Sequence, residues 1–182
     1  MKPKMTYYFV DTNIIISYIN EDDIKLIGYI NNPDNHFYYT ETVRNELNFK
    51  NILNEFKYKN IVPDIFKYVD SDISPERMNS IFKDIFDESK TFILTSEQIS
   101  KFKNDLKIIF EAGYVCYDIL PKDVFTEPKL LTHNLKLYNT SKALLETLIN
   151  NHGFEHLIQV IRPNDIFELS VLSTNQHCTI MP

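Results

Sequence analysis

The stretch that decides the fold is Thr6-Tyr7-Tyr8-Phe9-Val10-Asp11-Thr12-Asn13-Ile14-Ile15-Ile16. Its aromatic and β-branched beginning is typical of a β-strand. Residues 11–13 are of the kinds that favour turns and helix N-caps, and the apolar run after them fits the start of a helix. The stretch therefore predicts a strand, a turn and a helix, with an acidic side chain at the carboxyl end of the strand.

Strand and helix patterns continue to alternate along the chain. Helices are expected over 24–30, from Thr40 past Leu47, over 75–90, over 96–102, from Asn104 to a C-cap at Gly113, over about 140–151, and from Pro163-Asn164-Asp165 to Leu169. Strands are expected over 36–39, 129–132 and 157–161, residues 60–69 fit either element, and 114–128 resemble a loop. Short apolar strands separated by helices predict a three-layer α/β/α fold with a mostly parallel central sheet.

The length and the apolar content fit one domain. The chain has 182 residues, of which 43% are hydrophobic, enough to bury a single core. We expect one domain over residues 1–172 and a polar, mobile tail over 173–182. Because no apolar run approaches the ~20 residues that span a bilayer and no signal-peptide cleavage pattern opens the chain, we expect a cytoplasmic protein without a membrane partner.

The composition excludes several functional classes. The formal net charge is −6, so any contact with nucleic acid must be local rather than spread over a basic surface. With only 3 glycines, the chain lacks the glycine-rich loops of dinucleotide and P-loop sites. Cys116 and Cys178 stand far apart, which indicates neither a disulfide framework nor a zinc site.

Polar side chains gather at one predicted edge of the sheet. Asp11 follows the first strand, Glu46 lies one turn into the helix after the second, and Asn134 follows a late strand. Ligands of parallel sheets bind beyond the carboxyl ends of the strands, and Asp105 can join the group from a neighbouring helix. Clustered carboxylates repel one another unless a cation neutralises them, and oxygen ligands favour Mg²⁺ or Mn²⁺. Such a site can support phosphodiester hydrolysis.

Five segments carry a family resemblance. Residues 8–13, ending in Asp-Thr-Asn, and residues 40–47, with the pattern V-x-x-E-L, resemble the first two motifs of PIN-domain nucleases. The segment 104–112 is similar to the family's D-x-x-I-x-x-x-A helix, and 130–134 to the strand that ends in T-x-D. The last expected strand, over 157–161, together with residues 163–165 resembles its closing element. The resemblance implies a PIN-like fold.

The chain departs from the family pattern at two places. Asn134 stands where the family often has a fourth aspartate, and an amide can coordinate but brings no charge. Asp118 competes with Asp105 as the third acid. Because Pro121 would break a helix that begins at Asp118, we favour Asp105.

The resemblance also implies a function: an endoribonuclease that depends on Mg²⁺ or Mn²⁺ and cleaves single-stranded RNA, with an antitoxin-like protein as a possible partner. The implied catalytic residues are Asp11, Glu46 and Asp105, which with Asn134 form the expected metal ligands. Expected supporting residues are Thr12, Asn13 and Thr132, which would orient these ligands, and Arg44 and Lys136, which would contact substrate phosphates. The alternative is a PIN-like module that has lost catalysis and binds RNA or protein.

Overall fold

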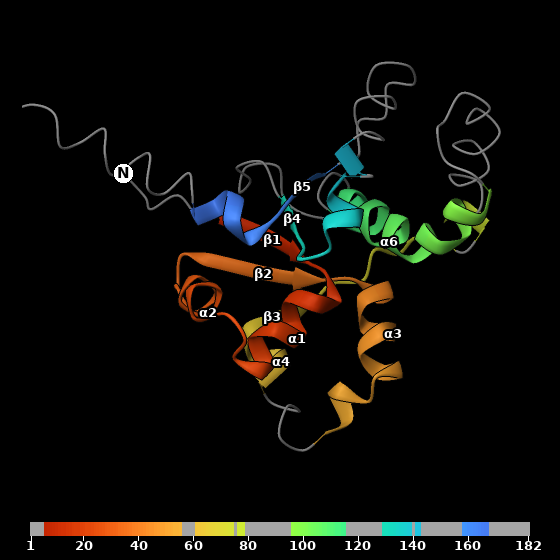
Figure 1. Cartoon of the computed structure of the whole chain (residues 1–182). Coiled ribbons are helices and arrows are strands. Elements are labelled where there is room, and N and C mark those ends of the chain that lie inside the picture. Colours follow the sequence, from red (N-terminus) through yellow and green to blue (C-terminus); the bar gives the residue numbers. More distant parts are fainter. Residues whose placement is uncertain are drawn as a thin grey trace, which may run out of the picture.

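The fold is built on a five-stranded sheet, seen in a computed structural model that describes residues 6–55, 61–74, 76–78, 96–115, 129–139, 141–142 and 158–167. The strands are β1 (Thr6–Val10), β2 (Asn35–Tyr39), β3 (Phe66–Tyr68), β4 (Lys129–Leu131) and β5 (Gln159–Ile161). Their order is β3-β2-β1-β4-β5, and all neighbouring strands are parallel (Figure 1). The predicted α/β class is thereby confirmed.

Helices lie on both sides of this sheet. They are α1 (Thr12–Asn20), α2 (Ile24–Ile30), α3 (Glu41–Phe49), α4 (Ile61–Ile65) and α6 (Ser96–Tyr114), with a 3-10 turn at Ile52–Asn54 and short helices over 135–139 and 163–167. Figure 1 shows α1 on one side of the sheet and α6 on the other. In the part of the chain that the structure describes, no helix is both long enough and apolar enough to cross a membrane.

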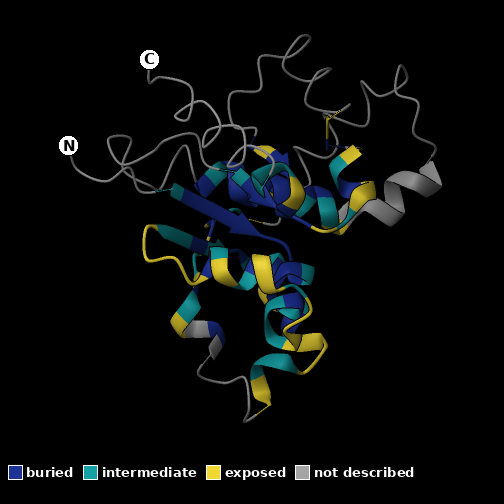
Figure 2. Cartoon of the chain, turned by 60° about the vertical axis from the view of Figure 1, so that its left-hand side comes forward, coloured by how far each residue is buried: buried dark blue, intermediate teal, exposed yellow. Residues whose placement is uncertain are grey.

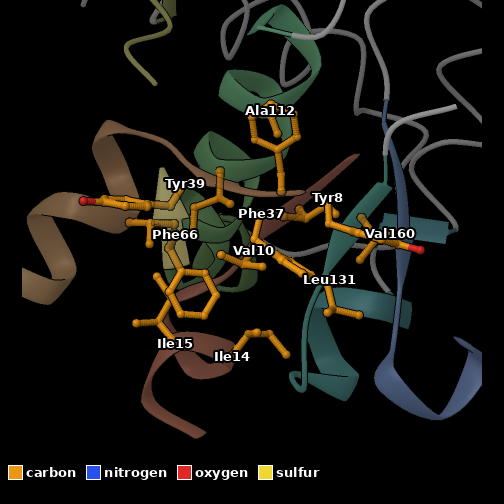
Figure 3. Close-up of a cluster of buried hydrophobic side chains, with 14 of the residues drawn as sticks. Tyr8, Val10, Ile14, Ile15, Phe37, Tyr39, Phe66, Ala112, Leu131 and Val160 are labelled. Carbon is orange, nitrogen blue, oxygen red and sulfur yellow. The ribbon is translucent and has the colours of Figure 1, made fainter. Parts of the chain in front are cut away.

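The core forms where these layers meet. Phe9 and Val10 of β1 are both buried although they face opposite sides of the sheet, as expected of a parallel strand covered on two faces. Figure 2 shows β1 buried over most of its length, while the helices carry exposed positions on their outer sides. In Figure 3, Ile14 and Ile15 of α1 lie on one side of the strands and Ala112 of α6 on the other.

Helix α3 begins with an arrangement that local sequence does not reveal. Thr40 occupies the N-cap position, as predicted, but its hydroxyl makes no capping bond and is buried without a partner. The buried carboxylate of Glu111 in α6 instead accepts bonds from the Thr42 backbone N–H (3.0 Å) and hydroxyl (2.7 Å). A charge near the positive end of the helix dipole is stabilising, so α6 fixes the start of α3.

The prediction of two separate helices between residues 96 and 113 is wrong, because α6 runs without a break to Tyr114. Gly113 lies inside the helix and is buried rather than ending it as a C-cap. The buried side chains of Leu106, Ile109 and Phe110 form one apolar face. Tertiary burial of such a face stabilises a helix more than local propensity does.

The remaining segments divide into those that the structure describes and those outside it. Residues 60–69, which the sequence left open, contain both α4 and β3. A short helix over 135–139, capped by Asn134, was not predicted. Most of the expected helices over 75–90 and 140–151, and the tail 173–182, lie outside the described residues.

Candidate active site

The connections of the sheet create one position where a site is expected. The chain proceeds from β1 to β2 and β3 in one direction, and from β4 to β5 in the other, so β1 and β4 are neighbours at a topological switch point. Open parallel sheets bind ligands beyond the carboxyl ends of the strands at such a point. Asp11 follows β1 and Thr132 follows β4, so both lie there.

Asp11 is held in one orientation by three hydrogen bonds. One carboxylate oxygen, Oδ1, accepts from the Thr12 backbone N–H (2.6 Å), and the other, Oδ2, accepts from the Asn13 amide (2.6 Å) and the Thr132 hydroxyl (2.7 Å). The side chain is only 4% exposed. Burial raises the pKa of the Asp11 carboxyl, the bond from Thr132 opposes that rise, and the charge of Glu46 adds to it.

Glu46 reaches the same place from α3. Its Oε2 accepts a hydrogen bond from the hydroxyl of Thr12, the residue next to Asp11. The apolar side chains of Val43 and Leu47, three residues before Glu46 and one after it, are buried, and this anchoring turns Glu46 toward the start of α1. The V-x-x-E-L pattern thus explains the placement of the second acid.

Asp105 lies on α6, close enough for the charges of the other two acids to act on it. Burial and then the charges of Asp11 and Glu46 raise the pKa of Asp105 to about 6, while the charge of Lys136 lowers it. The three carboxyl groups therefore act on one another electrostatically. We call Asp11, Glu46 and Asp105 the acidic site. The competing residue, Asp118, lies outside the described residues.

The segment after β4 closes around Asp11. Asn13 accepts a bond at its Oδ1 from the His133 backbone N–H (3.0 Å), and the Asn134 N–H donates to the Thr132 hydroxyl (2.9 Å). The Oδ1 atom of Asn134 accepts from the N–H groups of Lys136 (3.1 Å) and Leu137 (3.2 Å). The amide oxygen of Asn134 is thus engaged in capping the helix over 135–139.

The two expected phosphate-binding cations differ in their surroundings. Arg44 lies over the ring of Tyr68, 4.6 Å from its centroid, and pairs with Glu41 at 3.5 Å. Both interactions engage its guanidinium with groups outside the acidic site. Lys136, by contrast, acts electrostatically on Asp105. Of these two cations, Lys136 is the one whose charge reaches the acids.

A groove that sequence reasoning missed adjoins the acidic site. It has a volume of about 310 Å³ and lies between α3 and α6, with Glu46 in its wall. The other lining residues are Thr42, Asn45, Phe49, Lys50, Asn104 and Lys107. The sequence did contain a signal for this groove, because the spacing of Glu46, Phe49 and Lys50 places them on one helical face. The role of Glu111 in fixing the start of α3 had no such signal, because 69 residues separate Glu111 from Thr42.

The chain was compared with known families, curated proteins and solved structures. No protein-family model matches the chain, and no curated protein matches it. Among solved structures, the chain is similar to VapBC2 from Rickettsia felis bound to a DNA fragment from their promoter, with 18% sequence identity and a TM-score of 0.46 over 86% of this chain and 98% of that chain.

The acids at this edge of the sheet fit a largely hydrated cation. Over the described residues, no three His, Cys, Asp or Glu side chains stand close enough to form a ligand cage. Mg²⁺ is usually bound through one or two carboxylates together with several waters, so a cage is not required. Because a carboxylate offers about four acceptor positions and three bonds reach Asp11, one position on Asp11 is left for a ligand.

Proposed function

We propose that this chain is an endoribonuclease that depends on Mg²⁺ or Mn²⁺ and hydrolyses phosphodiester bonds in single-stranded RNA. The observation that carries the proposal is the buried Asp11 carboxylate at the switch point of the sheet, linked to Glu46 through the Thr12 hydroxyl. Charged groups that serve only the fold can also have shifted pKa values. This group, however, lies beyond the carboxyl ends of the strands, where parallel sheets bind their ligands.

Each residue of the site has a distinct task in this proposal. Asp11, Glu46 and Asp105 would hold the cation, which when bound offsets their repulsion and stabilises the charge that develops on the phosphate. Thr12, Asn13 and Thr132 keep the first two acids in fixed orientations, as the positioning groups around metal ligands do. The charge of Lys136 attracts the phosphate toward the acids. Asn134 supports the site by capping a helix and is not required as a ligand.

The test is incubation of the purified protein with mixed-sequence RNA, with Mn²⁺ or with a chelator. We expect cleavage that requires the metal and that is lost in Asp11→Asn. The matched control is Asp34→Asn, which removes the same charge from an exposed turn before β2, at the opposite end of the sheet. Cleavage that persists in chelator, or in Asp11→Asn, would contradict the proposal.

A second candidate is a PIN-like module that binds RNA or protein without cleaving. The engagement of Asn134 in capping favours it, because the position often held by a fourth acid then supplies no ligand oxygen. A protein partner, such as the antitoxin that the resemblance implies, would suit either candidate. RNA binding without any metal-dependent cleavage would select the module.

A further inference from the structure

The groove between α3 and α6 begins at the acidic site and ends on an exposed aromatic ring. Phe49 is 92% exposed. A single exposed apolar side chain is ordinary on a protein surface, but the position of this one is distinctive. Here the ring stands one helical turn beyond Glu46, a rise of about 4.5 Å along α3. Both side chains line the same groove.

Two lysines in this groove give it a local positive charge. Lys50 follows Phe49 at the end of α3, and Lys107 faces it from α6, two residues beyond Asp105. Neither lysine makes an ion pair with a described residue, whereas Arg44 on the same helix is paired with Glu41. The lysines are therefore available to anionic ligands, in a chain whose net charge is −6.

An aromatic ring beside two cations and next to a phosphodiester-cleaving site matches the chemistry of one nucleotide. Bases of single strands stack on exposed aromatic side chains, and lysines in the same groove bind the backbone phosphates. Asn45 and Asn104 also line the groove. Their amide groups can donate and accept hydrogen bonds to a sugar or a base edge. A protein partner would favour a broader apolar surface than one ring between two lysines.

We propose that Phe49, Lys50 and Lys107 form the subsite for the nucleotide that flanks the scissile phosphate in a single-stranded nucleic acid. The base stacks on Phe49, and the two lysines bind the phosphates on either side of it. The inference rests on the proposed function for the position of the scissile phosphate. The subsite itself acts by binding, so it can be tested without cleavage.

The experiment measures binding of a short fluorescent mixed-sequence oligonucleotide by anisotropy, in the presence of chelator so that metal-dependent cleavage cannot occur. An RNA arm and a DNA arm of the same sequence distinguish the two kinds of strand. Phe49→Ala should weaken binding by about 5- to 150-fold, the range for loss of one stacked base. Phe49→Leu should lose nearly as much and Phe49→Tyr little, because stacking requires the ring.

The lysines have a separate signature. The double variant Lys50→Gln with Lys107→Gln should lower the slope of log K against log salt by about 1.4, since each phosphate contact to a single strand contributes about 0.7. The Phe49 variants should leave this slope unchanged. Matched controls are Ile24→Ala, which removes another exposed apolar side chain (85% exposed), and Lys25→Gln, both on α2. Neither control should change binding.

The outcomes separate this subsite from the proposed nuclease. Loss of binding in the Phe49 and lysine variants supports the subsite even if the protein cleaves nothing, and the chain is then a binding module. Metal-dependent cleavage with binding that is indifferent to Phe49 overturns the subsite and leaves the nuclease standing. If the wild type binds neither oligonucleotide, the subsite is wrong and the exposed ring is assigned to a protein partner. All substituted side chains reach solvent, and unchanged thermal melting would show that the variants are folded.

Discussion

Replacing Asp105 with asparagine should make the protein without metal more stable at neutral pH. The folded protein raises the pKa of this carboxyl from 3.8 to about 6, so between these values the folded state binds more protons than the unfolded state. Stability must then fall as the pH rises through that window. Above about pH 6 the whole penalty is present, and Asp105→Asn removes it.

The size of the effect follows from the shift. About 2 pKa units correspond to about 3 kcal/mol, and because Asp105 is partly exposed to solvent, screening reduces this to about 1–2 kcal/mol. Most substitutions destabilise by a similar amount, so a gain in stability is a distinctive result. The charge of Lys136 opposes the penalty and is already included in the raised pKa.

Urea denaturation of both proteins at a series of pH values from 4 to 8, without divalent ions, measures the difference. We expect similar stabilities near pH 4 and a growing advantage of Asp105→Asn as the pH approaches 7. The control, Asp34→Asn, should differ from the wild type by an amount that does not change in this way. If Asp105→Asn is less stable at pH 7, or if its difference from the wild type is independent of pH, the electrostatic account of the acidic site is refuted.

Three further results are expected from the same site. Mn²⁺ at a hundredfold excess over its dissociation constant should stabilise the wild type by about 2.7 kcal/mol. The variants Asp11→Asn and Glu46→Gln should gain much less in melting temperature. If millimolar Mn²⁺ leaves the melting temperature of the wild type unchanged, the metal site is excluded. Thr12→Val removes the hydroxyl that binds Glu46 and should lower metal affinity by about 10- to 100-fold, with recovery in Thr12→Ser, as measured by titration calorimetry. Asn134→Ala should destabilise the fold by about 1 kcal/mol through loss of its cap yet keep the melting response to Mn²⁺, whereas loss of that response would identify Asn134 as a ligand.

The local patterns of the sequence were sufficient to predict the elements around β1. Its aromatic and β-branched residues, followed by Asp11 as the start of α1, are short-range signals that tertiary structure did not override. The alternation of such strands with helices was enough for the parallel sheet. The same local signals placed Asp11 directly after β1 and Glu46 in α3, the helix that follows β2.

Contacts between distant residues could not be predicted in this way. The cap that Glu111 provides for α3 and the bond from Thr12 to Glu46 join residues far apart in the chain. Asn134 has a second role that the sequence analysis missed. An asparagine after a strand is also an ordinary N-cap, and the short helix over 135–139 that it caps was not predicted. Its expected role as a metal ligand stays a prediction.

The charge of Asp11 exceeds what a helix cap requires. As the N-cap of α1, the residue needs only a short side chain with an acceptor oxygen, and serine or asparagine serves there as well as aspartate. A carboxylate that is 4% exposed is harder to accommodate, because burial disfavours its charged form more than a neutral cap. Three hydrogen bonds lower the pKa of Asp11, and the pKa is nevertheless raised, with Glu46 adding to the rise. Two carboxylates joined through Thr12 thus oppose each other in the folded protein, and a cation would relieve that opposition. The cation binding that we propose for this site would account for a charge at position 11 that the fold does not need.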